Sequence, residues 1–146
     1  MTAPGNAALR RLALKVLALR AGPGAGAEAL AAAARRAYDE LAQVAAPLIG
    51  QAGVDALTGR ALHLTQRQYP WLLPAGDPQQ SEGLFARVIF RLERQHPAVA
   101  TEAAGVLFAT FTGLLVTFIG EPITARLLRK AWPDAFSEAD AEETRA

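Results

Sequence analysis

A long uncharged segment near the C-terminal end constrains the fold of this chain more than any other feature. Residues 103–120 read AAGVLFATFTGLLVTFIG and contain no acidic or basic side chain. Side chains four positions apart lie on the same face of a helix. One face of this segment therefore carries a narrow stripe, which we call the small-residue stripe: Gly105, Ala109, Gly113, Thr117 and, just beyond the segment, Glu121. The other faces carry large apolar side chains, so the helix must be buried in a protein core or in a bilayer.

The composition favours helices that pack through small side chains. Hydrophobic residues make up 51% of the 146 residues but only 7% are aromatic, and alanine, leucine and arginine are strong helix formers. The sequence shows neither a strand pattern nor an internal repeat, and its length suits one domain with a single core. We therefore predict an all-α fold, a single-domain bundle of five to six helices around one central apolar helix at about 98–120.

Proline and glycine residues divide the rest of the chain into shorter helices. Apolar residues with helical spacing predict helices at about 6–20, 27–46, 54–68, 77–95 and 122–132. Asn6 and Asp77 are expected to cap the first and fourth helices, and Pro47 with Gly50 is expected to break the chain after the second. The apolar loop at 69–74 contains two prolines and is expected to pack onto the bundle.

The two ends of the chain differ in charge. We expect the bundle domain to span residues 1–133, with residues 1–21 as an acid-free amphipathic helix that a Gly-Pro-Gly joint allows to detach. Packing of this helix on its own core is the favoured arrangement. Residues 134–146 carry five acids against one arginine, so this segment is expected to be an acidic, partly disordered tail.

Residue types for catalysis or for metal binding are sparse. The absence of cysteine excludes disulfides, thiolate nucleophiles and thiolate metal sites. His63 and His96 have no further ligands at metal-binding spacing, and the glycine clusters lack the Lys-Ser/Thr of a phosphate loop. We therefore expect no catalytic residues, no cofactor and no metal, and the protein is not predicted to be an enzyme.

Surface features point to contacts with other proteins. Arg87, Arg91 and Arg94 share one side of the fourth helix and form a candidate basic contact face. The net charge of +1 provides no overall attraction for polyanions, so nucleic acid is not an expected partner. The sequence predicts a cytoplasmic, non-enzymatic helical module for protein–protein interaction or regulation that self-associates through a helical face.

Two alternatives remain open at this point. A membrane-associated protein would use 103–120 as a span. A carrier or sensor of an apolar small molecule or lipid would instead line a cavity with the small-residue stripe.

Overall fold

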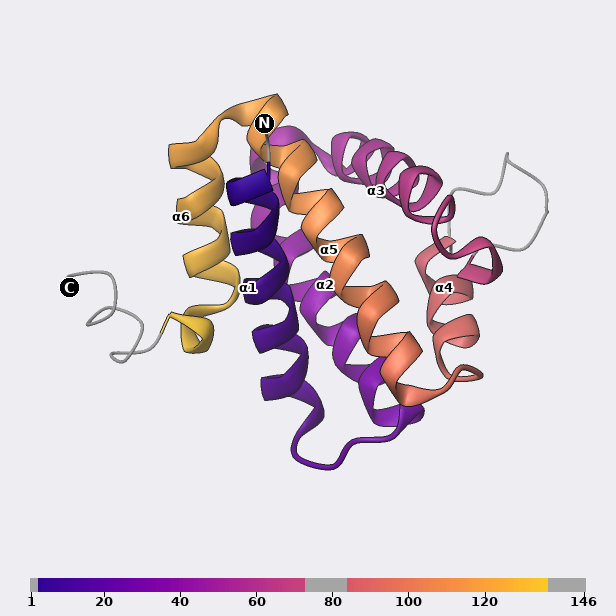
Figure 1. The fold of residues 1–146 in the computed structure, drawn as a ribbon. Coiled ribbons are helices and arrows are strands. Elements are labelled where there is room, and N and C mark those ends of the chain that lie inside the picture. Colours follow the sequence, from indigo (N-terminus) through magenta and orange to yellow (C-terminus); the bar gives the residue numbers. More distant parts are fainter. Residues whose placement is uncertain (1–2, 73–83, 137–146) are drawn as a thin grey trace.

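The computed structural model describes residues 3–72 and 84–136, and these fold into α-helices joined by short turns (Figure 1). The α-helices are α1 (Ala3–Ala21), α2 (Ala27–Ile49), α3 (Gln51–Thr65), α4 (Leu84–Leu92), α5 (Pro97–Ile119) and α6 (Glu121–Ala131). Two 3-10 turns, η1 (Pro70–Leu72) and η2 (Pro133–Ala135), follow α3 and α6. The described residues contain no strand, which confirms the prediction of an all-α bundle.

Helix α5 lies in the middle of the bundle, as its apolar character requires. It packs against α1, α2, α3 and α6, and the residues of its central turns belong to the main core. The core residues that α5 contributes are Ala100, Ala103, Ala104, Leu107, Phe108, Phe111 and Leu115. The prediction of one central apolar helix is confirmed, and α2 lies beside α5 as a second helix at the centre.

Several predicted helix boundaries differ from the structure, and α3 for example spans Gln51–Thr65 rather than 54–68. Helix α2 continues through Pro47 to Ile49, so the prediction of a break at Pro47 is wrong. Pro47 lies in the last turn and faces solvent, where the loss of one backbone hydrogen bond is tolerated. Asn6 lies inside α1, which begins at Ala3, and α4 ends at Leu92 rather than Gln95. The cap expected at Asp77 falls outside the described residues.

The chain repeats one arrangement of helices 70 residues apart, contrary to the expectation that it has no internal repeat. Helices α2 and α5 both have 23 residues, and their first and last residues differ by 70 positions. Each ends in an Ile-Gly pair, and the next helix begins at the residue after the glycine. The backbone angles match closely, with φ 83° and ψ 156° at Gly50 and φ 92° and ψ 158° at Gly120.

Burial follows the same spacing. Positions that are buried in the first half are buried again 70 residues later, in the pairs Ala37 and Leu107, Leu41 and Phe111, Ala45 and Leu115, Val54 and Thr124, and Ala61 and Ala131. Of these five pairs only the last has the same residue twice. Buried alanines also recur at Ala33 and Ala103 and at Ala34 and Ala104, but such matches are not distinctive in an alanine-rich chain. The structure can thus be divided into two three-helix units, α1–α2–α3 and α4–α5–α6, which match over α2–α3 and α5–α6. The first helices differ, because α1 packs on α2 of its own unit and α4 has no comparable contact with α5.

These two units interlock. Helices α1 and α3 of the first unit pack on α5 of the second, whereas α4 and α6 of the second unit pack on α2 of the first (Figure 1). Figure 1 shows α2 and α5 rising in the same direction, so that Gly50 and Gly120 lie at the same end of the bundle. Each unit buries the central helix of the other, and the core is shared between them.

Gly50 and Gly120, the single residues between α2 and α3 and between α5 and α6, are called the glycine elbows below. They provide a test of this arrangement. Replacement of Gly50 or Gly120 by alanine should lower the free energy of unfolding by about 1–3 kcal/mol, because a side chain strains a backbone in this region of φ and ψ. Gly59→Ala is the matched control: Gly59 has no positive φ, and no atom would lie within 4 Å of its new Cβ. Urea titration should show Gly59→Ala to be stabilised by about 0.5–1 kcal/mol. Equal effects at all three positions would contradict the prediction.

Candidate interaction surface

The first half of the small-residue stripe is a contact within the chain. A Cβ added at Gly105 would lie 2.8 Å from Cδ2 of Leu14 on α1, so the absence of a side chain allows α1 to approach α5 closely. Gly105 and Ala109 are buried, Gly113 is half-buried, and Thr117 and Glu121 are exposed. The stripe thus begins under α1 and reaches the surface at the end of α5.

The small cavity and the surface concavity described below are lined by residues other than those of the stripe. The hydroxyls of α5 donate hydrogen bonds to carbonyls of the preceding turn, as Thr101 does to Pro97 and Thr117 to Gly113. A small apolar cavity lies between α2, α3, α4 and α5, and its volume is only about 10 Å³. That is the space of about one water molecule, too small for an apolar ligand. Its walls are Tyr38, Thr58, Ala61, Phe85, Leu107, Phe108 and Phe111.

The contact between Leu14 and Gly105 can be measured by a double-mutant cycle. Gly105→Leu should lower the free energy of unfolding by about 1–3 kcal/mol, because the new side chain occupies the space of Leu14. When Leu14 is already replaced by alanine, Gly105→Leu should lower the free energy of unfolding by at least about 0.5 kcal/mol less than it does in the original chain. Chemical denaturation of the four proteins gives the coupling, and strict additivity would mean that the two positions do not meet.

The opposite end of the bundle from the elbows is held by polar contacts. Arg20, at the end of α1, donates from Nε to Glu40 on α2 at 2.9 Å and from Nη2 to Asp134 in η2 at 3.0 Å. The hydrogen bond with Asp134 raises the pKa of Arg20 against the opposing effect of burial, and it lowers the pKa of Asp134. Trp132, which is 1% exposed, donates from Nε1 to the Ala37 carbonyl at 3.1 Å. Asp134, the first residue of the predicted tail, thus contacts the bundle.

This ion cluster predicts a pH dependence of stability. Because the pKa of Asp134 is lower in the folded state, its carboxylate stabilises the fold above the unfolded value of about 3.9, and that contribution is lost as the pH falls below it. For the original chain, the urea concentration at the midpoint of unfolding should be lower at about pH 3 than at about pH 7. Asp134→Asn should make this difference smaller. An unchanged difference would show that Asp134 contributes nothing. Asp55→Asn, on an exposed carboxylate of α3, is the control.

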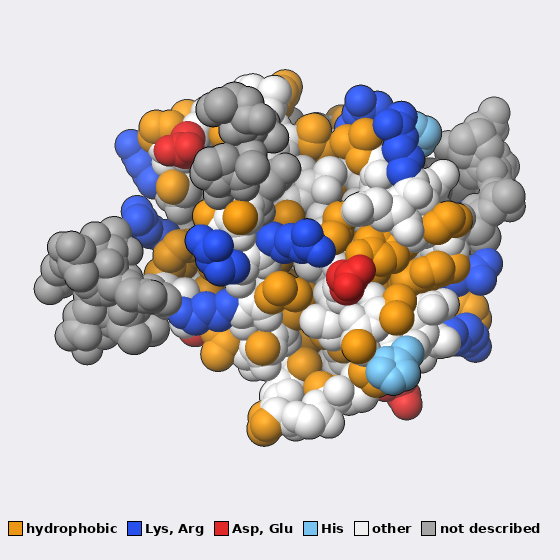
Figure 2. Space-filling view, in the orientation of Figure 1, with side chains coloured by type: hydrophobic (Ala, Val, Ile, Leu, Met, Phe, Trp, Pro, Cys, Tyr) orange, Lys and Arg blue, Asp and Glu red, His pale blue; other side chains and the backbone are white. Residues whose placement is uncertain are grey.

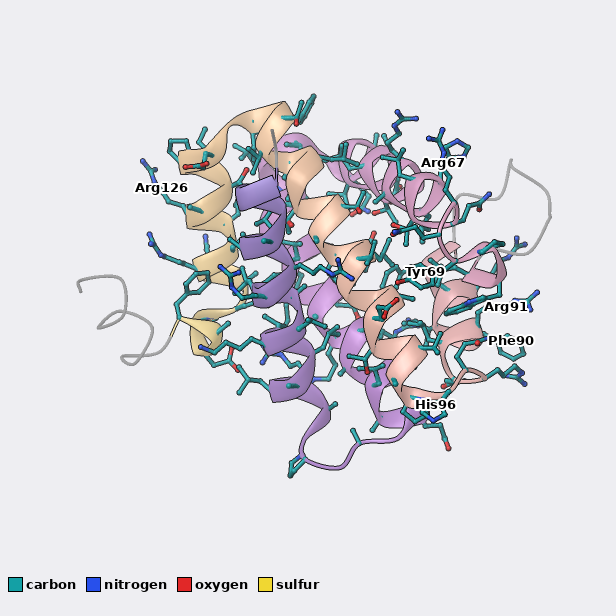
Figure 3. All side chains as sticks on the ribbon, in the orientation of Figure 1. Arg67, Tyr69, Phe90, Arg91, His96 and Arg126 are labelled. Atoms are coloured by element: carbon teal, nitrogen blue, oxygen red, sulfur yellow. The ribbon has the colours of Figure 1, made fainter. Side chains whose placement is uncertain are left out.

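The loop after α3 is fastened to α5. The buried Tyr69 hydroxyl donates to the Glu102 carboxylate, and the Trp71 ring meets the Tyr69 ring edge-on at 6.0 Å between centroids (Figure 3). Burial, together with this carboxylate, raises the pKa of Tyr69 to about 12. The phenol therefore stays protonated at neutral pH and serves as a structural donor. The expectation that this apolar loop packs onto the bundle is confirmed for residues 69–72, and residues 73–74 lie outside the described part.

The predicted basic face on α4 is built around an aromatic side chain. Phe90 is 51% exposed, and the guanidinium carbon of Arg94 lies 3.5 Å from the centre of its ring. An open concavity of about 410 Å³ beside it is lined by Ala86, Arg87, Phe90 and Arg91, and Figure 3 shows Phe90 and Arg91 on the outer side of the bundle. Arg94 is exposed, whereas Arg87 and Arg91 are half-buried. Sequence reasoning missed Phe90, although an aromatic residue among arginines on the polar face was a usable signal.

Large apolar side chains reach the surface where the two elbows lie. Leu48, Phe118 and Ile123 are 52%, 64% and 40% exposed, and Figure 2 shows hydrophobic side chains at the surface along the upper edge of the molecule. Leu48 and Phe118 are equivalent positions of the repeat. Ile123 follows Gly120 at the start of α6, which packs along α2. We call this surface, formed by Leu48, Phe118 and Ile123, the elbow end.

Histidines and acids do not gather into a metal site in the described part of the chain. No group of three or more metal-ligating side chains occurs there. His96 accepts a hydrogen bond from the Ala98 amide at 3.1 Å and so caps α5, while His63 is exposed on α3.

Helix α5 is the single described helix that is long and apolar enough to cross a membrane. Half of its most apolar window is buried by the rest of the protein.

Comparisons with known proteins identify no relative. No family model matches the chain, and no curated protein or solved structure matches it.

Proposed function

We propose that this protein is a non-enzymatic helical interaction module that self-associates through the elbow end. The observation that carries the proposal is the exposure of Leu48, Phe118 and Ile123, which lie close in sequence to the two elbows at one end of the bundle. Burial of a large apolar side chain contributes about 1.5–3 kcal/mol. Three such exposed side chains near one end of the bundle favour association, and exposed apolar side chains that gather in patches commonly mark contact sites.

The internal repeat favours a second copy as the partner. A two-fold dimer uses the same patch on both subunits, so the patch must be complementary to itself. At the elbow end, Leu48 of one copy can meet Phe118 of the other, because the two positions are equivalent in the repeat. The same arrangement places the exposed Glu121 opposite Gln51, its equivalent in the first unit, whose side-chain amide donates to Asp55 at 3.0 Å.

The membrane alternative is less well supported by the packing. If α5 moved into a bilayer, the faces of α1, α2 and α3 that rest on it would lose their partner. The core position of α5 therefore supports a protein that works in the cytoplasm, as expected from the sequence. Flotation with liposomes distinguishes the two proposals, because a membrane-spanning chain would float with the lipid in high salt.

Self-association can be tested with variants of the full chain. Light scattering over a range of concentrations should show dimers for the original chain. Leu48→Ser with Phe118→Ser should weaken dimerisation by ~10-fold or more, about 1.4 kcal/mol, because the variant loses apolar area from the interface. Leu19→Ser is the matched control, since Leu19 is 48% exposed at the opposite end of the bundle.

The proposal fails if the original chain stays monomeric at about 1 mM, the concentration at which even a weak contact of about 4 kcal/mol is half-formed. It also fails if the elbow variant dimerises as strongly as the original chain. Circular dichroism of the variants confirms that they remain folded.

A further inference from the structure

The surface of α4 combines an apolar centre with a positive rim. Phe90 is half exposed beneath the Arg94 guanidinium, and Arg91 lines the concavity beside it. The described sequence of α4, LFARVIFRL, contains no acid. Within the described part of the chain, neither Arg91 nor Arg94 forms an ion pair. This surface suits a segment in which carboxylates alternate with small apolar residues, because arginine pairs well with carboxylates.

The chain itself contains a segment of this chemistry. Residues 137–146 read SEADAEETRA, with carboxylates at Glu138, Asp140, Glu142 and Glu143 and alanines between the first three. The segment follows Phe136, whose ring lies 5.6 Å from the Arg129 guanidinium carbon on α6. Figure 1 shows α6 and α4 on opposite sides of the bundle. The segment therefore begins far from the α4 surface of its own chain, which favours the α4 surface of another copy.

We infer that the acidic tail, residues 137–146, of one copy binds the α4 surface, formed by Ala86, Arg87, Phe90, Arg91 and Arg94, of a second copy. The carboxylates pair with Arg91 and Arg94, and an alanine of the tail covers the exposed Phe90 ring. This contact joins two different surfaces and is separate from the elbow end, so it extends assembly beyond the proposed dimer. Because exposed charges carry it, added salt weakens it, whereas the apolar elbow contact persists.

Complementary variants of the full chain test the inference. Both carry Leu48→Ser and Phe118→Ser, which removes the elbow contact. The first adds Phe90→Ser and Arg91→Ser and keeps its tail; the second adds Glu138→Gln, Asp140→Asn, Glu142→Gln and Glu143→Gln and keeps its α4 surface. Sedimentation velocity at low salt should show each variant alone as a monomer. A mixture should form heterodimers, because the tail of the first meets the α4 surface of the second.

Loss of these heterodimers at about 1 M salt, where charges are screened beyond about 3 Å, is the further expected result. Arg60→Ser with Arg67→Ser is the matched control, because both arginines are exposed, one on α3 and one in the turn after it. Added to the chain that carries only Leu48→Ser and Phe118→Ser, it should leave association unchanged. The inference is overturned if the mixture stays monomeric. It is also overturned if the chain that carries only Leu48→Ser and Phe118→Ser stays monomeric at low salt while the mixture forms heterodimers, because each tail then binds its own chain. It is equally overturned if either variant alone associates as strongly as the chain that carries only Leu48→Ser and Phe118→Ser. A third outcome separates the two proposals: the mixture forms heterodimers, but Leu48→Ser with Phe118→Ser does not weaken association of the original chain. In that case self-association through the elbow end is rejected, whereas the inference about the tail stands.

Discussion

The whole structure depends on covering a helix that is apolar almost all round. A helix such as α5 cannot lie on the edge of a small protein, because every face that remains uncovered exposes large apolar side chains to water. Neighbours on several sides solve this problem, and α1, α2, α3 and α6 provide them. Two of these neighbours, α1 and α3, belong to the first unit, whereas α5 belongs to the second. The two units therefore cannot be separated without opening the core. Interlocking is therefore the direct consequence of the hydrophobicity of α5.

The close approach of α1 makes that cover tight. Leu14 reaches the backbone of α5 at Gly105, where any side chain would stand in its way. Packing at this distance removes apolar surface from water and gains dispersion contacts on both helices. It also explains the glycine at position 105, whereas Thr117 and Glu121 of the same stripe are exposed.

The two ends of the bundle differ in how they are finished. At one end, Arg20 and Trp132 tie α1, α2 and the segment after α6 together with side-chain hydrogen bonds. At the other, the glycine elbows reverse the chain in a single residue and leave Leu48 and Phe118 in solvent. An abrupt reversal leaves no loop to fold over these side chains. The geometry that shortens the connection thus also creates the apolar surface on which the proposed self-association rests.

The sequence by itself determined the helical class, the need of α5 for apolar surroundings and the arginine face of α4, because these follow from the spacing of residues along one helix. It also showed the small residues of the stripe, but not which helix would lie on them. Only the tertiary structure decided that Leu14 fills the stripe at Gly105, that Pro47 is tolerated in a last turn, and that Leu48 and Phe118 share one end. The repeat stayed hidden because a buried position requires volume and apolarity rather than identity, so that Leu41 and Phe111 can fill equivalent places. Such relationships arise between helices, where no pattern along a single segment records them.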